Sequence, residues 1–157
     1  MPTSLRWYGL ALLVIVVDCV SKLAVLDALA PGESRALAPF FNLVLVFNKG
    51  AAFSFLAGAD GWQTLVFAAI AIIASIVIVF LIHKNVNKSL FCGGLALILG
   101  GALGNLYDRL VYGHVVDFLD LHAAGWHWPA FNVADSAITV GAGLLILESF
   151  LQRGDAA

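Results

Sequence analysis

Four apolar stretches divide the chain, and each is long enough to cross the hydrocarbon core of a bilayer as a helix of about 20 residues. The clearest runs from Gly61 to His83 without a formal charge. In the uncharged stretch Ser89 to Tyr107, Gly100 and Gly104 stand four residues apart, a spacing that lets a neighbouring helix approach closely. The pattern predicts transmembrane helices at about 7–26, 62–82, 89–107 and 134–151.

Two long segments, about 27–60 and 108–133, join these helices on one side of the membrane. In the first, the aromatic and β-branched run Phe40 to Phe47 is followed by Asn48-Lys49-Gly50 and by the apolar Ala51 to Leu56. This order is typical of a small hairpin or sheet. We expect it to lie at the outer membrane surface.

Basic residues near the helix ends predict the orientation, because cytoplasmic loops carry an excess of Lys and Arg. One side has Arg6, Lys84, Lys88 and Arg153, and the other has Arg35, Lys49 and Arg109. The sequence therefore predicts a mainly α integral membrane protein of a single domain, 1–157. It would have four transmembrane helices, a small external β-hairpin or sheet, and both termini in the cytoplasm.

Composition supports this class of protein. Of the 157 residues 62% are apolar and 11% charged, which excludes a soluble globular domain. The net charge of -2 and the lack of a basic run argue against a nucleic-acid partner. Cys19 and Cys92 lie within apolar stretches, without the spacing of a zinc site or a disulfide framework.

The first apolar stretch contains two charges, Asp18 and Lys22. Spaced four residues apart on one helix face, they are expected to satisfy each other as an ion pair. A cleavable signal peptide is the alternative for this stretch, but Asp18 and Cys19 stand where a cleavage site needs small residues. We therefore expect a permanent helix.

Carboxylates gather at the outer boundary: Asp108, Asp117 and Asp120 follow the third apolar stretch, and Asp135 opens the fourth. Asp117 has apolar neighbours on both sides, which raises a carboxyl pKa, whereas Asp135 lies at a predicted helix N-terminus, where it could simply cap the helix. If folding brings these two within about 3–5 Å, they should share one proton. That arrangement suits an aspartic peptidase, in which one carboxylate activates water and its protonated partner binds the carbonyl oxygen.

Other polar residues suggest less specific roles. Asn48, Asn105 and Asn132 adjoin apolar runs and could either bind an extended peptide or tie loops together. The histidines at 114, 122 and 127 lie scattered in a predicted loop, without the spacing of a metalloprotease helix. We expect neither a metal nor another cofactor.

Four stretches together resemble the lipoprotein signal peptidases, also called signal peptidase II. They are Asp18-Cys19-Val20-Ser21-Lys22, Asn48-Lys49-Gly50-Ala51-Ala52-Phe53, GGALGNLYDRLVYGHVVDF from Gly100 to Phe118, and FNVADSA from Phe131 to Ala137. The third and fourth stretches are each specific for this family on their own, whereas the first would be weak evidence by itself. The resemblance covers nearly the whole chain.

The resemblance implies an aspartic endopeptidase of the bacterial cytoplasmic membrane, with Asp117 and Asp135 as its catalytic dyad. It implies cleavage of diacylglyceryl-modified prolipoproteins just before the lipidated cysteine. Small residues such as Gly101 and Ala134 would leave room for the substrate backbone. By the same resemblance, the positions that shape or line the site are Asp18, Lys22, Asn48, Gly50, Gly101, Asn105, Arg109, Asn132 and Ala134. We expect membrane lipids as partners and a monomer.

Two other classes of protein fit part of the pattern. A small proton-coupled transporter would also carry intramembrane carboxylates and glycine-rich helices, but corresponding broken helices in two repeat halves are not evident. A non-catalytic membrane scaffold would explain the glycines and aromatic residues, but not carboxylates and amides at one depth.

Overall fold

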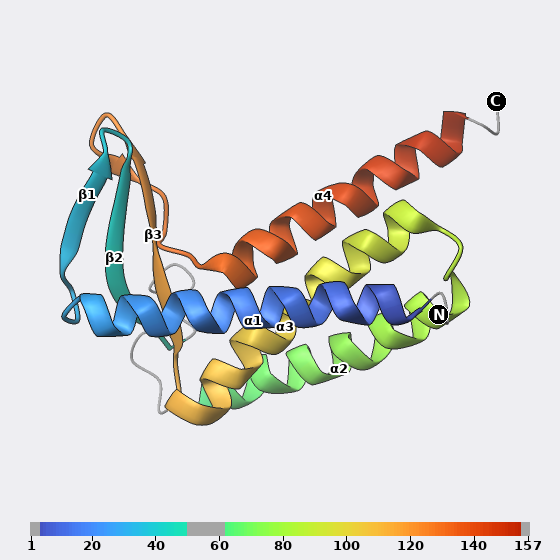
Figure 1. Ribbon diagram of the computed structural model, residues 1–157, viewed down its shortest axis with the longest axis horizontal. Helices are drawn as coiled ribbons and strands as arrows, with labels where there is room; N and C mark the ends of the chain where they lie inside the picture. The colour runs from blue at the N-terminus through green and yellow to red at the C-terminus, as the bar shows by residue number, and fades with distance from the viewer. Residues whose placement is uncertain (1–3, 50–61, 155–157) are drawn as a thin grey trace.

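The computed structural model describes residues 4–49 and 62–154 and contains four helices long and apolar enough to span a membrane. In chain order the elements are α1 (Leu5–Ala28), β1 (Ser34–Ala38), β2 (Phe41–Asn48), α2 (Trp62–Lys84), α3 (Ser89–Tyr112), β3 (Val115–Ala123), β4 (Trp126–His127) and α4 (Val133–Gly154). The predicted fold class is confirmed. The sheet lies at one end of the bundle, opposite the end where α1 begins and α4 ends (Figure 1).

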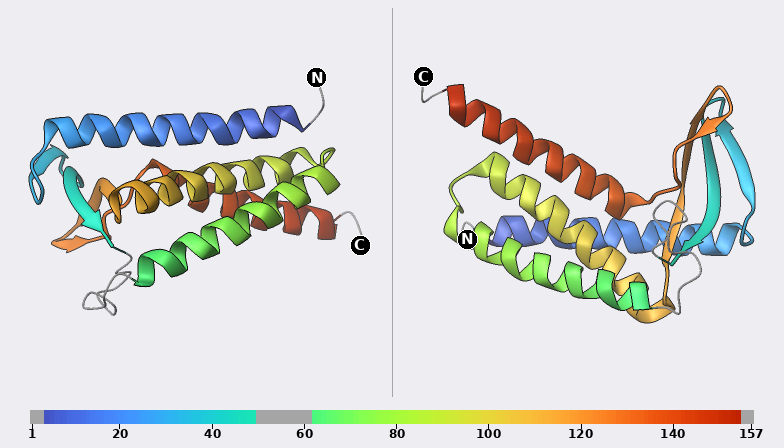
Figure 2. Two further views of the ribbon diagram at one scale, coloured as in Figure 1. Left: turned by 90° about the horizontal axis from the view of Figure 1, so that it is seen from below. Right: turned by 180° about the vertical axis from the view of Figure 1, so that it is seen from behind.

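Helix α3 is the centre of the bundle. It packs against α1, α2 and α4, and Figure 2 shows it between α1 and α2. The outer helices bury only a narrow stripe; in α1 this is Ala11, Val14, Asp18, Lys22 and Val25, spaced three or four residues apart. The remaining faces are apolar as well, as expected of helices that contact lipid.

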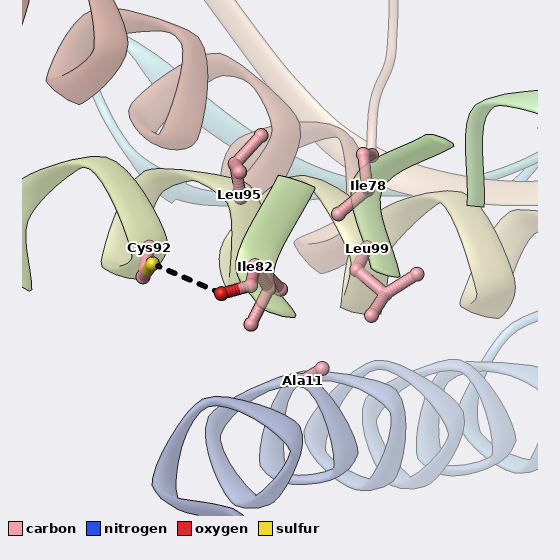
Figure 3. Packing of buried hydrophobic residues seen from close by; sticks show 6 residues of the cluster. All are labelled: Ala11, Ile78, Ile82, Cys92, Leu95 and Leu99. Carbon is pink, nitrogen blue, oxygen red and sulfur yellow. Dashed lines mark hydrogen bonds between the residues drawn. The ribbon is translucent and has the colours of Figure 1, made fainter. Parts of the chain in front are cut away.

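An apolar core forms where α1, α2 and α3 meet, away from the sheet. Its buried members are Ala11, Ile78, Ile82, Cys92, Leu95 and Leu99 (Figure 3). Cys92 is fully buried, and its thiol donates to the backbone oxygen of Asn85 at 3.0 Å. Both cysteines are free thiols, so the bundle is held by packing rather than by a disulfide.

Close helix contacts depend on glycine. A Cβ on Gly100 would meet the backbone oxygen of Ala11 at 2.6 Å, which confirms the role predicted for this residue. A Cβ on Gly104 would meet Oδ2 of Asp18 at 2.8 Å. On the other side of α3, Gly94 and Gly141 each lie against the backbone oxygen of the other, so α3 and α4 touch backbone to backbone.

Replacing Gly141 with Ala should therefore destabilise the bundle. The added Cβ would lie 2.5 Å from the backbone oxygen of Gly94, and overpacking of this kind costs about 1–3 kcal/mol. Gly143→Ala is the matched control, because a Cβ there meets nothing within 4 Å. Thermal unfolding in detergent should show a lower midpoint for the first variant only, and equal midpoints would contradict the contact.

The sheet is antiparallel with strand order β1-β2-β3-β4. β2 falls where the sequence predicted a strand, but the hairpin turn precedes it, at Pro39 and Phe40, and its second partner is β3. The predicted small sheet is therefore confirmed, with β1 and β3 as the partners of β2. The apolar 51–56 lies outside the described residues. Val116 and Phe118 of β3 pack with Leu45 against the end of α1.

Helix α3 is longer than predicted. It continues to Tyr112 and ends at Gly113, whose left-handed backbone (φ 74°) allows its N–H to bond the oxygen of Arg109. Asp108 and Arg109 consequently lie on the helix rather than in the external segment. This extra turn aims Asp108 into the protein, where it is 2% exposed.

Candidate active site

The structure brings Asp117 and Asp135 to one residue, Asn132, although they come from different elements. Asp117 is the third residue of β3, and Asp135 lies in the first turn of α4. The side-chain amide of Asn132 donates to Oδ1 of Asp117 at 2.7 Å, and its backbone N–H donates to Oδ2 of Asp135 at 3.3 Å. Both carboxyl groups therefore border the same asparagine.

Asn132 also caps α4. Its side-chain oxygen accepts the N–H of Asp135 at 2.9 Å, while Asp135 accepts the N–H of Asn132 in return. This reciprocal pair is a capping box, so the capping interpretation of Asp135 describes a real contact. It uses only Oδ2 of Asp135. Oδ1 accepts the side-chain amide of Asn105 at 2.8 Å.

Asp117 is 2% exposed and accepts a second amide, from Asn48, at 2.9 Å. Burial, and after it the negative charge of Asp135, raises the pKa of Asp117 from 3.8 to about 7. The amide donors of Asn48 and Asn132 and the positive charge of Lys22 act against this rise. Asp117 is thus poised to hold or release a proton near neutral pH.

A buried cluster of charges lies behind the two carboxyl groups. The predicted pair forms: Nζ of Lys22 donates to Oδ2 of Asp18 at 2.6 Å. The same ammonium also lies 2.8 Å from Oδ2 of Asp108 and donates to Oδ1 of Asn105 at 3.0 Å. Asp108 therefore has a basic partner in Lys22.

The remaining predicted site residues fall into three groups. Arg109 donates to the backbone oxygen of Asn105 at 3.1 Å, and its guanidinium lies over the ring of Phe67. Gly101 and Ala134 face each other across the α3–α4 contact, where the backbone oxygen of Ala134 occupies the space above Gly101. At Gly101 the absent side chain makes room for the backbone of α4, and the room for a substrate backbone stays a prediction. Gly50 lies outside the described residues.

An apolar pocket of about 410 Å³ adjoins Asp135. Its walls come from the sheet end and from the first turns of α4: Leu121, Trp128, Phe131, Asp135, Ser136, Thr139 and Val140. The hydroxyl of Ser136 donates to the carbonyl of Asn132 and that of Thr139 to the carbonyl of Asp135, so Asp135 is the ionisable group that this pocket presents. An apolar segment of a ligand could lie here against the carboxylate.

Two of the histidines lie in strands and not in a loop as predicted. His122 and His127 are partners in the β3–β4 pair and stack with ring centroids 4.9 Å apart. Nδ1 of His127 lies 2.9 Å from Oδ1 of Asp120. Among residues 4–49 and 62–154, no group of three His, Cys, Asp or Glu side chains is arranged to hold a metal ion.

Comparison with known proteins gives one consistent family. Residues 10–151 match the family profile described as signal peptidase (SPase) II. Lipoprotein signal peptidases of Paraburkholderia phymatum and Burkholderia mallei are 56% and 58% identical over 142 residues, covering 90% of this chain and 86% of theirs.

Two solved structures, each described as a bacterial membrane enzyme, share the fold. One has a TM-score of 0.85 at 32% sequence identity and covers 97% of this chain and 92% of its own. The other has a TM-score of 0.81 at 33% identity and covers 91% of each. The likeness includes the sheet as well as the helices, since nearly the whole chain is covered.

Proposed function

The chain belongs to the signal peptidase II family, a family of multi-pass membrane proteases that remove signal peptides from lipoproteins, and we propose that it does so with Asp117 and Asp135 as an aspartic dyad. One observation carries the proposal: two carboxyl groups from separate elements border Asn132, and one of them has a pKa of about 7. Two such groups can hold one proton between them at neutral pH.

The contacts of the two carboxyl groups suggest different roles. Asp135 accepts the side-chain amide of Asn105 from α3 and the backbone N–H of Asn132, and it lies at the N-terminus of α4, whose dipole stabilises a negative charge. Asp117, buried and near its pKa at neutral pH, holds the proton. Asp135 then removes a proton from the attacking water, and Asp117 donates a hydrogen bond to the peptide carbonyl oxygen. When the tetrahedral intermediate breaks down, its C–N bond is cleaved and the proton that Asp135 took from water passes to the leaving amine.

We propose that the scissile bond precedes a cysteine that carries diacylglycerol. The pocket beside Asp135 supports this, because its walls are apolar and lie next to the carboxylate that would activate water. The sheet lies at one end of the bundle (Figure 1), and the two carboxyl groups belong to β3 and to the first turn of α4. This arrangement supports a site near the outer face of the bacterial cytoplasmic membrane, with both termini in the cytoplasm. The enzyme would act as a monomer among membrane lipids.

The test is cleavage of matched precursor peptides by the purified protein. One peptide carries diacylglycerol on the cysteine, and the other has the same sequence without the lipid. We expect mass spectrometry to detect a product that begins at the lipidated cysteine and no product from the unmodified peptide. Equal cleavage of both peptides, or cleavage at another bond, would overturn the proposed specificity.

The dyad also predicts a pH dependence. Because the pKa of Asp117 is about 7, the group is protonated below neutral pH and loses its proton as the pH rises through 7. We therefore expect kcat/KM to fall on the alkaline side of neutrality. Initial rates in buffers of constant ionic strength would measure this, and a rate that keeps rising above neutral pH would contradict it.

A further inference from the structure

Two carboxylates outside the dyad bind the backbone directly before each dyad residue. Oδ1 of Asp18 accepts the N–H of Ala134, which precedes Asp135, at 2.9 Å. Oδ2 of Asp108 accepts the N–H of Val116, which precedes Asp117, at 3.1 Å. In both contacts the carboxylate accepts the N–H of the residue directly before a dyad aspartate, although Asp18 comes from α1 and Asp108 from α3.

Lys22 joins these two carboxylates. Its ammonium lies 2.6 Å from Asp18, 2.8 Å from Asp108 and 3.0 Å from the side-chain oxygen of Asn105. The ammonium donates hydrogen bonds to Asp18 and Asn105 and forms an ion pair with Asp108. Asp18 is 0% exposed, and Lys22 and Asp108 are each 2% exposed, so the protein encloses all three charges.

We propose that Lys22, Asp18 and Asp108 form a yoke that fixes the separation of Asp117 and Asp135, and that Asp108 is the positioning residue for Asp117 as Asp18 is for Asp135. Both backbone polar groups of Val116 are bound, because its oxygen accepts the side-chain amide of Asn132 at 3.2 Å while its N–H binds Asp108. The yoke thus connects α1, α3, β3 and α4 behind the site.

This inference rests on the proposed function, in which the two carboxyl groups act as one unit. A shared proton requires a short and constant separation, and a displacement of about 1 Å at a reacting group can lower a rate about 100-fold. Buried ion pairs contribute little net stability compared with apolar packing. Holding one geometry is therefore the better physical reason for three buried charges in an apolar bundle.

The experiment compares Asp108→Asn and Asp18→Asn, with Asp120→Asn as a matched control. Asp120 lies on β3 like Asp117, is also buried, and bonds Asn42 and His127 away from the yoke. Amide hydrogen exchange is measured at Val116 and Ala134. We expect faster exchange at Val116 in Asp108→Asn and faster exchange at Ala134 in Asp18→Asn, with both amides unchanged in the control.

Cleavage of the lipidated peptide by folded, monodisperse protein is the second readout. For Asp108→Asn we expect kcat to fall about 10- to 100-fold with KM within about two-fold of its original value. The alkaline fall in the pH–rate profile of Asp108→Asn should also move to lower pH. The Lys22 charge is then less neutralised, so it lowers the pKa of Asp117 more strongly. Asp120→Asn should keep the original pH profile.

If Asp108→Asn does not fold, Asp108→Glu is the second variant that tests the proposal. It keeps a negative charge for Lys22 but moves the acceptor away from Val116, so it should restore folded protein without restoring kcat. Restored kcat in Asp108→Glu, or original kcat and exchange in Asp108→Asn, would overturn the yoke. Failure of the proposed function looks different: the unmodified enzyme would not cleave the lipidated peptide, while the exchange pattern would still report on the yoke.

Discussion

Asp117→Asn is expected to lower the cleavage rate of the lipidated peptide by at least about a thousand-fold, within the range that positioned acid–base groups contribute. An asparagine cannot exchange a proton with substrate or water, and it cannot share one with Asp135. Asp135→Asn should cause a similar loss, because the water would lack its base. Single-turnover rates with excess enzyme would measure both.

Asp117→Asn should lower activity but raise the thermal stability at alkaline pH relative to the unmodified protein. The pKa of Asp117 is raised from 3.8 to about 7 in the folded protein, so the group favours folding below pH 3.8, and that advantage is lost as the pH rises through about 7. Asparagine does not ionise. The thermal midpoint of Asp117→Asn relative to the unmodified protein should therefore be higher at about pH 8 than at about pH 5.

These two results together separate a chemical role from a structural one. Asp120→Asn removes a different carboxylate from the same strand and should keep the turnover of the unmodified protein. Turnover of Asp117→Asn within ten-fold of the original would remove this residue from the dyad. A midpoint difference that does not change with pH would show that Asp117 is not the buried group that resists ionisation.

Local patterns in the sequence predicted the parts of the site that lie within one element. Asp18 and Lys22 were paired from their spacing of four residues on a helix. The position of Asp135 in a first helical turn followed from the apolar run that comes after it. Each of these features depends on neighbours within a few residues.

Features that depend on distant segments were not predictable in this way. Lys22 and Asp108 are 86 positions apart, and no local pattern connects them. Strand β3 was missed because it is buried on both faces at Val115 to Phe118, so polar and apolar residues do not alternate there. The burial of Asp108 could have been predicted from helical spacing. If the third helix is extended by one turn, Asp108 lies on the same face as Gly101 and Asn105.

Lys22→Met is expected to destabilise the fold by about 3–5 kcal/mol, the usual cost of removing one partner from a buried ion pair. Methionine fills a similar volume without a charge, so the loss comes from electrostatics rather than from a cavity. It would leave Asp18 and Asp108 without their cation at 0% and 2% exposure. The yield of monodisperse protein and its thermal midpoint would measure the loss.

Arg35→Met is the matched control for Lys22→Met, because the ion pair that it breaks, with Glu33, has side chains 56% and 40% exposed. Exposed pairs contribute at most about 1 kcal/mol, so this variant should fold normally. Combining Lys22→Met with Asp18→Asn and Asp108→Asn removes all three charges and should recover part of the lost yield. It should not recover kcat, since neutral side chains relieve the buried charge without rebuilding the contacts that hold Val116 and Ala134. Normal folding of Lys22→Met alone would contradict the buried pairing, because two uncompensated carboxylates cannot remain in this interior at no cost.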